Sequence, residues 1–258
     1  MNLNETWTWT EKILAVAVAL QSFEFLSFRK CWSEQGLWRW SILRLEYPRT
    51  LRAVLDFFLA EKSFSRLLHA RIVLSAFLLI FPATIFFNGC LLLGLFFLCL
   101  LTSVRWRGAF NGGSDSMTLI TLFFAGLSAV SQRPQVSRFC LLMVATNLCL
   151  SFVIAGLSKL RDPYWRSGRA LELLMSTSNY HSLKTKIASR FAGQLANWFI
   201  LLFEVAFPLA FLSQPLALLF ISFALLFHVL NWRLFGLNRF LFAWGAAYPS
   251  LFYFAFPI

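Results

Sequence analysis

The chain has 258 residues, of which 59% are hydrophobic and 13% are charged. A soluble domain carries roughly a quarter charged residues to cover its water-facing surface, so this composition excludes an ordinary soluble protein. The net charge of +12 suits contact with anionic lipid headgroups at the ends of membrane helices, and we expect no nucleic-acid partner.

Apolar segments recur along the sequence, and each is close to the ~20 residues that a helix needs to cross a bilayer. They do not alternate as the strands of a membrane barrel do. We therefore expect an all-α, polytopic membrane helical bundle that forms one domain over residues 1–258. The eight predicted spans are Ile13–Phe28, Leu68–Phe87, Asn88–Val104, Met117–Ser131, Phe139–Ser158, Gln194–Ser213, Pro215–Trp232 and Phe240–Phe256.

Three further segments mix charged with apolar residues and are not predicted to cross the bilayer. In Gly36–Lys62, apolar residues recur at helical spacing with arginines between them, which is typical of amphipathic helices lying in the membrane interface. The same applies to Ser167–Met175 and Ser182–Phe191. Their charged residues would be too costly at the bilayer centre.

The basic residues test the number of spans independently, because they accumulate on the cytoplasmic side of membrane proteins. Alternate loops collect 20 of the 23 Lys and Arg residues, and the other side holds Lys12, Arg133 and Arg138. A missing or additional span would scramble this distribution. It therefore predicts eight spans with both termini outside.

The segment Arg105–Ser116 is rich in small and polar residues. Asn111-Gly112-Gly113 permits positive backbone φ angles, and Asp115 or Ser114 can cap the helix that is predicted to begin at Met117. A turn with a helix cap explains the segment. The alternative is a backbone cradle in which Asn111 and Asp115 bind a ligand at the helix start.

Ionisable residues at membrane depth are expensive and are therefore functional candidates. Glu24, Glu204 and His228 lie inside predicted spans. Glu204 makes either a structural interhelical hydrogen bond or an ion pair in a site, and His228 is either a core hydrogen-bonding residue or an acid–base group. Three histidines do not favour paired haem ligation, and five cysteines without CxxC spacing do not predict a metal site.

The segment Ile154–Gly168 carries two interpretations. Lys159 follows directly after an apolar helix, so its side chain can extend to the lipid headgroups. The ending Ala-Gly-x-x-Lys-Leu, followed by Trp165 and Gly168, also resembles the transmembrane domain shared by vitamin K-dependent γ-carboxylases and their bacterial relatives, the HTTM domain. Phe227–Phe235, with the pattern Phe-His-x-x-Asn-x-x-Leu-Phe, is similar to a later membrane segment of the same family.

The resemblance covers about Asn111–Phe252 and implies a chemistry. In the carboxylases, the lysine matched by Lys159 deprotonates reduced vitamin K, and the oxygenated quinone then takes a proton from a glutamate so that CO2 can add. The resemblance thus implies a quinone or another lipid-soluble ligand, with Lys159 as base. It also indicates a bacterial inner membrane as the location.

Two features depart from the carboxylase pattern. The carboxylases carry a large extramembrane domain after the membrane part, whereas this sequence ends at Ile258, so we do not expect it to carboxylate peptides alone. The carboxylase lysine works on the lumenal face, whereas the basic residues place Lys159 on the cytoplasmic face. We adopt the orientation that the charges give.

Physical reasoning predicts that the candidate residues share one cavity. Glu204 and His228 lie on neighbouring spans joined by a short turn, and the cation of Lys159 would lower the cost of burying the carboxylate. Trp165 can form an aromatic wall for a flat ligand, and Asn231, one turn from His228, can donate a hydrogen bond. We thus assign catalytic roles to Lys159, Glu204 and His228, and ligand binding to Trp165 and Asn231.

Three functions remain open at this point. The first is an enzyme that acts on a quinone or another lipid-soluble ligand. The second is a non-enzymatic membrane subunit that serves as scaffold, maturation or export partner of another membrane or soluble protein. The third, a small-solute transporter, is the least favoured because the sequence shows no matching halves with broken helices.

Overall fold

The computed structural model describes residues 1–80, 86–106, 112–177 and 190–256, and this part of the chain is all-α without a strand. The helices are α1 (Leu3–Ser27), α2 (Arg29–Trp32), α3 (Trp40–Leu43), η1 (Arg44–Glu46), α4 (Arg49–Leu59), α5 (Glu61–Ile80), α6 (Phe86–Trp106), α7 (Gly112–Ser131), α8 (Pro134–Arg161), α9 (Pro163–Arg166), α10 (Arg169–Thr177), α11 (Arg190–Ala206), η2 (Phe207–Leu212), α12 (Gln214–Phe235), α13 (Asn238–Gly245) and α14 (Tyr248–Phe254).

Six helical segments of the described chain are long and apolar enough to cross a bilayer. They are α5, α6, α7, α8, α12 and the segment Gly193–Leu212, which combines most of α11 with η2. The chain is therefore a polytopic helical membrane protein, as predicted. The number of eight spans stays a prediction, because α1 and the α13–α14 segment do not meet the same criteria.

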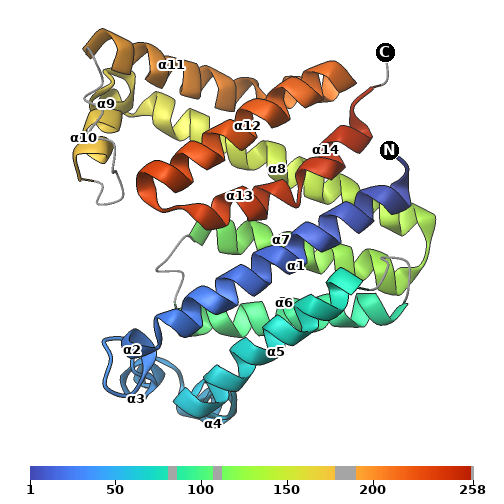
Figure 1. The fold of residues 1–258 in the computed structure, drawn as a ribbon, viewed down its shortest axis with the longest axis vertical. Coiled ribbons are helices and arrows are strands. Elements are labelled where there is room, and N and C mark those ends of the chain that lie inside the picture. The colour runs from blue at the N-terminus through green and yellow to red at the C-terminus, as the bar shows by residue number, and fades with distance from the viewer. Residues whose placement is uncertain (81–85, 107–111, 178–189, 257–258) are drawn as a thin grey trace.

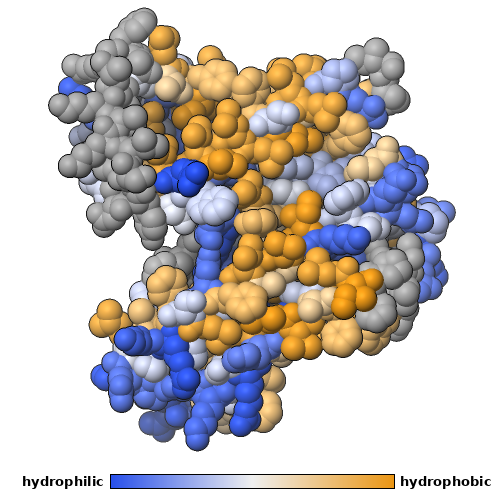
Figure 2. Space-filling model, viewed as in Figure 1, coloured by the Kyte–Doolittle hydropathy of each residue, from blue (hydrophilic) through white to orange (hydrophobic). Residues whose placement is uncertain are grey.

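Successive long helices run in alternating directions through one bundle, and both termini lie at the same end of it (Figure 1). Apolar side chains cover the middle of the molecule in Figure 2, and hydrophilic residues gather around α2–α4 on the left and at the α7–α8 turn on the right. Many of these apolar side chains are exposed, among them Phe77, Phe199, Leu202, Leu219 and Leu226. An exposed apolar belt between two polar ends fits a bilayer as the solvent.

The first predicted span begins earlier than expected. α1 starts at Leu3 because Asn2 and Glu5 form a capping box, with 2.9 Å from the Glu5 amide to the Asn2 side chain and 2.9 Å back from the Asn2 amide to the Glu5 carboxylate. The helix therefore includes Glu11 and Lys12, which the sequence analysis left outside it.

The prediction of one continuous helix over Phe240–Phe256 is wrong, because this segment forms α13 and α14 with a break at Ala246–Ala247. Pro249 lies in the first turn of α14 and has no amide hydrogen to continue the helical hydrogen bonds across the break. The two short helices still run back along α12, since the amide of Gln214 donates to the Phe256 carbonyl at 2.9 Å.

The segments predicted to lie in the interface are short helices rather than a further span. Gly36–Lys62 contains α3, η1 and α4, tied together where Asp56 accepts from Trp40 Nε1 at 2.6 Å and pairs with Arg44 at 2.7 Å. Ser167–Met175 corresponds to α10. Most of Ser182–Phe191 lies outside the described residues.

Candidate functional site

The α8 and α11 helices pack closely enough to bring their polar residues together (Figure 1). A Cβ added at Gly156 on α8 would lie 2.9 Å from the Glu204 Cβ and 3.0 Å from the Val205 amide nitrogen on α11. Small residues permit such approaches between membrane helices. Gly156 therefore brings the last turn of α8, with Lys159, next to Glu204.

The Lys159 side chain points into the bundle and forms an ion pair with the Glu204 carboxylate. Its Nζ also lies 5.1 Å from the ring centroid of Trp165 and 5.8 Å from that of Phe227, within the range of cation–π attraction. The Glu204 side chain is 2% exposed and that of Lys159 is 19% exposed. Lys159 thus does not extend to the headgroups, and its positive charge offsets part of the cost of burying Glu204.

Two residues that were not predicted as site residues, Asn197 and Gly168, position the backbone around Trp165. Asn197 on α11 is fully buried, and its side-chain amide donates to the backbone carbonyl of Trp165 on α9. Gly168 has φ +77°, and a Cβ there would lie 3.1 Å from the Gln194 Cα. The backbone after Trp165 therefore turns against α11 in a conformation that favours glycine.

His228 on α12 is 2% exposed and is surrounded by aromatic rings. Its ring centroid lies 5.5 Å from that of Phe227, 5.5 Å from that of Trp244 and 6.0 Å from that of Phe152. Neither ring nitrogen has a hydrogen-bond partner among the described residues, and the same holds for Glu204 Oε2. Buried polar atoms are nearly always hydrogen-bonded, so these three atoms are available to a ligand.

These residues share one cavity of about 480 Å³, which we call the Lys159 cavity. A volume of this size is in the range of small-molecule sites, as is the combination of an apolar lining with a few convergent polar groups. The structure brings together all five residues that the sequence analysis placed there, although it does not test their chemical roles. They are Lys159, Trp165, Glu204, His228 and Asn231.

The other predicted ligand-binding residues lie elsewhere. Asn111 is outside the described residues. Asp115 lies in the first turn of α7 and does not line the Lys159 cavity, because it accepts a hydrogen bond of 2.5 Å from Gln21 Nε2 and lies 3.7 Å from Arg239 Nη1. Ligand binding by Asn111 and Asp115 at the helix start stays a prediction.

Asp115 belongs to a second buried polar group, which we call the arginine network. Arg239 Nε donates to Glu24 at 2.7 Å, and Arg71, which is fully buried, donates to Gln21 and, at 2.9 Å, to Thr102. Arg71 is one of the 20 basic residues counted on the cytoplasmic side, although it lies within the predicted span Leu68–Phe87 and within α5. The network joins α1, α5, α6, α7 and α13 through Gln21, Glu24, Arg71, Thr102, Asp115, Asn238 and Arg239.

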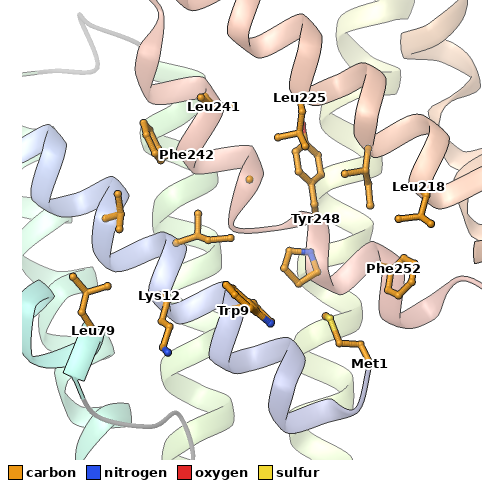
Figure 3. A pocket seen from close by; sticks show the side chains of 15 residues that line it. Met1, Trp9, Lys12, Leu79, Leu218, Leu225, Leu241, Phe242, Tyr248 and Phe252 are labelled. Carbon is orange, nitrogen blue, oxygen red and sulfur yellow. The ribbon is translucent and has the colours of Figure 1, made fainter.

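A larger apolar groove of about 710 Å³ opens between α1, α12, α13 and α14. Figure 3 shows aliphatic and aromatic side chains along it, including Trp9, Leu225 and Phe252, and places Lys12 at its edge. The groove lacks the convergent polar groups of the Lys159 cavity. No group of three or more His, Cys, Asp or Glu side chains in the described chain is arranged to hold a metal ion.

A family model for the HTTM domain matches residues 120–255, from α7 to α14. This match covers more than half of the 258 residues and includes all five candidate residues of the Lys159 cavity. The chain belongs to the HTTM domain family. The family resemblance drawn from the Lys159 and His228 segments is thereby confirmed. No curated protein sequence and no solved structure matches this HTTM protein.

Proposed function

We propose that this HTTM protein binds a lipid-soluble ligand with a flat polar head, of the quinone or hydroquinone type, in the Lys159 cavity. One observation carries the proposal: an apolar cavity of about 480 Å³ is lined by a buried Lys–Glu ion pair and by a histidine with two unpartnered nitrogens. The apolar walls suit a ring and its hydrocarbon tail, and the polar groups suit ring oxygens.

Lys159 is the proposed base. Within the ion pair, its ammonium can pass a proton to Glu204, which leaves a neutral amine and a neutral carboxylic acid. The amine then takes a proton from a ring hydroxyl of the ligand, which becomes an anion beside the restored ammonium. His228 and Glu204 Oε2 can hydrogen-bond the ring oxygens, and the Trp165 face can stack on the ring.

The test is binding of a naphthohydroquinone to the purified protein in lipid nanodiscs under anaerobic conditions. The wild type is expected to bind it and to shift its absorbance to that of the hydroquinone anion. Lys159→Met should weaken binding about tenfold or more, as expected for loss of a hydrogen bond to a charged group, and should abolish the anion absorbance. Lys12→Met, which removes a lysine outside the cavity, is the control and should bind as the wild type does.

Equal affinity and an unchanged spectrum in Lys159→Met would overturn the role of Lys159 as base. A protein that binds no quinone but copurifies with a stoichiometric protein partner would instead support the alternative, a membrane subunit that serves as scaffold or maturation partner.

We infer further that the protein lies in a bacterial inner membrane with both termini outside. The uneven distribution of basic residues supports this orientation, since 20 of the 23 Lys and Arg residues are counted on one side of the eight predicted spans, in the connections or close to the ends of the spans. Reporter fusions at Met1 and at Ile258 should both be active only outside the cytoplasm. Reporters that place the two ends on opposite sides would contradict it.

A further inference from the structure

A polar cavity of about 260 Å³ lies at the opposite end of α8 from Lys159. α8 has 28 residues, so its two ends are about 40 Å apart. We call this the Glu11 cavity. It is enclosed by the first turns of α1, the end of α7 and the start of α8, and its polar lining includes Asn4, Glu11, Ser128, Gln132, Arg133 and Ser137.

Glu11 is the unusual member of this lining. It is 2% exposed, and its Oε2 has no hydrogen-bond partner among the described residues. A buried carboxylate oxygen without a hydrogen-bond partner is unfavourable for stability, so Glu11 is a candidate for binding a ligand. A cationic group placed in the cavity would remove this cost.

The wall around Glu11 is ordered by its own hydrogen bonds. Trp7 Nε1 and Ser128 Oγ both donate to Ser137 Oγ at 2.8 Å, which ties α1 and α7 to the start of α8. Gln132, directly after the last residue of α7, has φ +50°, the left-handed conformation that commonly ends a helix. The hydrogen bonds of Ser137 thus hold the walls of the cavity in place.

Arg133 adds a positive charge to the same lining, yet it forms no ion pair with Glu11 in the described structure. The lining of one cavity thus combines an unpartnered carboxylate oxygen of Glu11 with the exposed residue Arg133. A ligand that carries both an ammonium and an anion would satisfy both groups, whereas a simple anion or a simple cation would satisfy one.

The ammonium that fits is a primary one. A carboxylate oxygen with neighbouring hydroxyl and amide groups accepts hydrogen bonds, and a primary ammonium has three N–H donors. A quaternary ammonium has none and is recognised by cages of several aromatic rings. Here Trp7 is the aromatic residue in the lining, and its indole N–H is already bonded to Ser137.

We propose that the Glu11 cavity binds a primary ammonium that is linked to an anionic group, with the ammonium at Glu11 and the anion at Arg133. Phosphoethanolamine has this chemistry, both as a lipid headgroup and as a free molecule. The cavity lies at a polar end of the bundle, where headgroups are found (Figure 2). This site is independent of the function proposed for the Lys159 cavity.

The experiment measures lipid binding to the full chain in neutral detergent by native mass spectrometry. The probes are phosphatidylethanolamine, phosphatidylcholine with the same acyl chains, and free phosphoethanolamine. The wild type should prefer the ethanolamine lipid over the choline lipid about tenfold, and Glu11→Gln should abolish the preference. The control is Glu5→Gln, which removes an equal charge from an exposed position on the same helix and should keep it.

Further measurements show whether the ligand is a lipid or a free molecule and whether the Glu11→Gln protein is folded. Binding of free phosphoethanolamine that depends on Glu11 would identify a soluble ligand, and binding of the diacyl form alone would identify the lipid. Arg133→Gln should weaken phosphoethanolamine-type binding in either case.

Glu11→Gln is expected to be at least as thermally stable as the wild type, because it removes a buried unpaired carboxylate. Equal affinity for both lipids in the wild type, or a preference unchanged by Glu11→Gln, would overturn the proposal.

Discussion

The Lys159 cavity and the arginine network are both groups of buried charges, yet they differ in the space around them. The cavity beside Lys159 has about 480 Å³, whereas the space beside Gln21 and Asp115 has about 10 Å³, room for at most about one water molecule. In the network, both oxygens of Glu24 accept hydrogen bonds from α13, while Glu204 Oε2 has no partner among the described residues.

This difference separates two uses of an ionisable residue inside a membrane protein. Charges that pair with one another and leave little free space fix the arrangement of helices, even though Arg71 Nε and Arg239 Nη1 have no hydrogen-bond partner among the described residues. Charges with unpartnered atoms beside a cavity are available to a ligand. Burial alone does not distinguish the two, since Arg71 and Glu204 are both almost inaccessible. This distinction leads to predictions about variants, which follow from the largest expected effect to the smallest.

The largest effect is expected from Arg239→Met, which leaves Glu24 and Asp115 without their cation. Breaking a buried ion pair by removing one partner typically costs about 3–5 kcal/mol. Thermal unfolding in detergent should show this loss, while the folded fraction keeps its affinity for naphthohydroquinone. Arg233→Met, at an exposed position near the end of α12, is the control and should change little. A stable Arg239→Met protein would show that the network is not structural.

A smaller effect on stability is expected from Lys159→Met, about 2 kcal/mol, because Glu204 loses a charged hydrogen bond but can be protonated. The double variant Lys159→Met/Glu204→Leu should recover this stability, since replacing a buried ion pair with apolar residues is often neutral. It should not recover ligand binding. If the double variant did recover ligand binding, the Lys159–Glu204 ion pair would have a structural role, as the charges of the arginine network do.

Gly156→Val tests whether the close approach of α8 and α11 forms the cavity. The new side chain would overlap Glu204 and Val205, and such overpacking costs about 1–3 kcal/mol. We expect weaker naphthohydroquinone binding because Lys159 moves away from Glu204. Gly94→Val on α6 is the control, since a Cβ there meets Leu74 Cδ1 at 4.0 Å and no closer atom. Equal ligand affinity in Gly156→Val would contradict the proposed geometry.

The smallest effect is expected from Asn197→Ala, which releases the backbone carbonyl of Trp165. Side-chain hydrogen bonds between membrane helices contribute about 1 kcal/mol. Binding of naphthohydroquinone should weaken a few-fold through a freer Trp165, with the anion absorbance of the bound ligand unchanged because Lys159 remains. Loss of that absorbance in Asn197→Ala would mean that Asn197 acts on Lys159 and not through Trp165.

The sequence predicted the helical bundle from its long apolar runs, and Lys159, Glu204 and His228 as ionisable residues in or next to those runs. Trp165 and Asn231 were predicted from the segments that resemble the HTTM family and from their stacking and hydrogen-bonding chemistry. The sequence did not predict the arginine network, since nothing in the local sequence of Arg71 or Gln21 shows which helix faces them. Asn197 was missed for the same reason: its partner is a backbone carbonyl 32 residues away. The break between α13 and α14 had a local signal, Pro249, which the apolar run around it outweighed.

The broken α13–α14 segment also separates the Lys159 cavity from the apolar groove. α13 lies between two spaces, since Phe240 and Trp244 line the Lys159 cavity while Leu241, Phe242 and Gly245 line the apolar groove. α14 is anchored to the start of α12 through the backbone bond between Gln214 and Phe256. α13 itself is held by Asn238 and Arg239, which bond to Glu24 on α1, and by Trp244, whose indole N–H donates to Ser151 on α8 at 3.0 Å. One turn of a short helix thus forms the wall between a polar cavity and an apolar groove, and substitutions on its two faces change the two spaces separately.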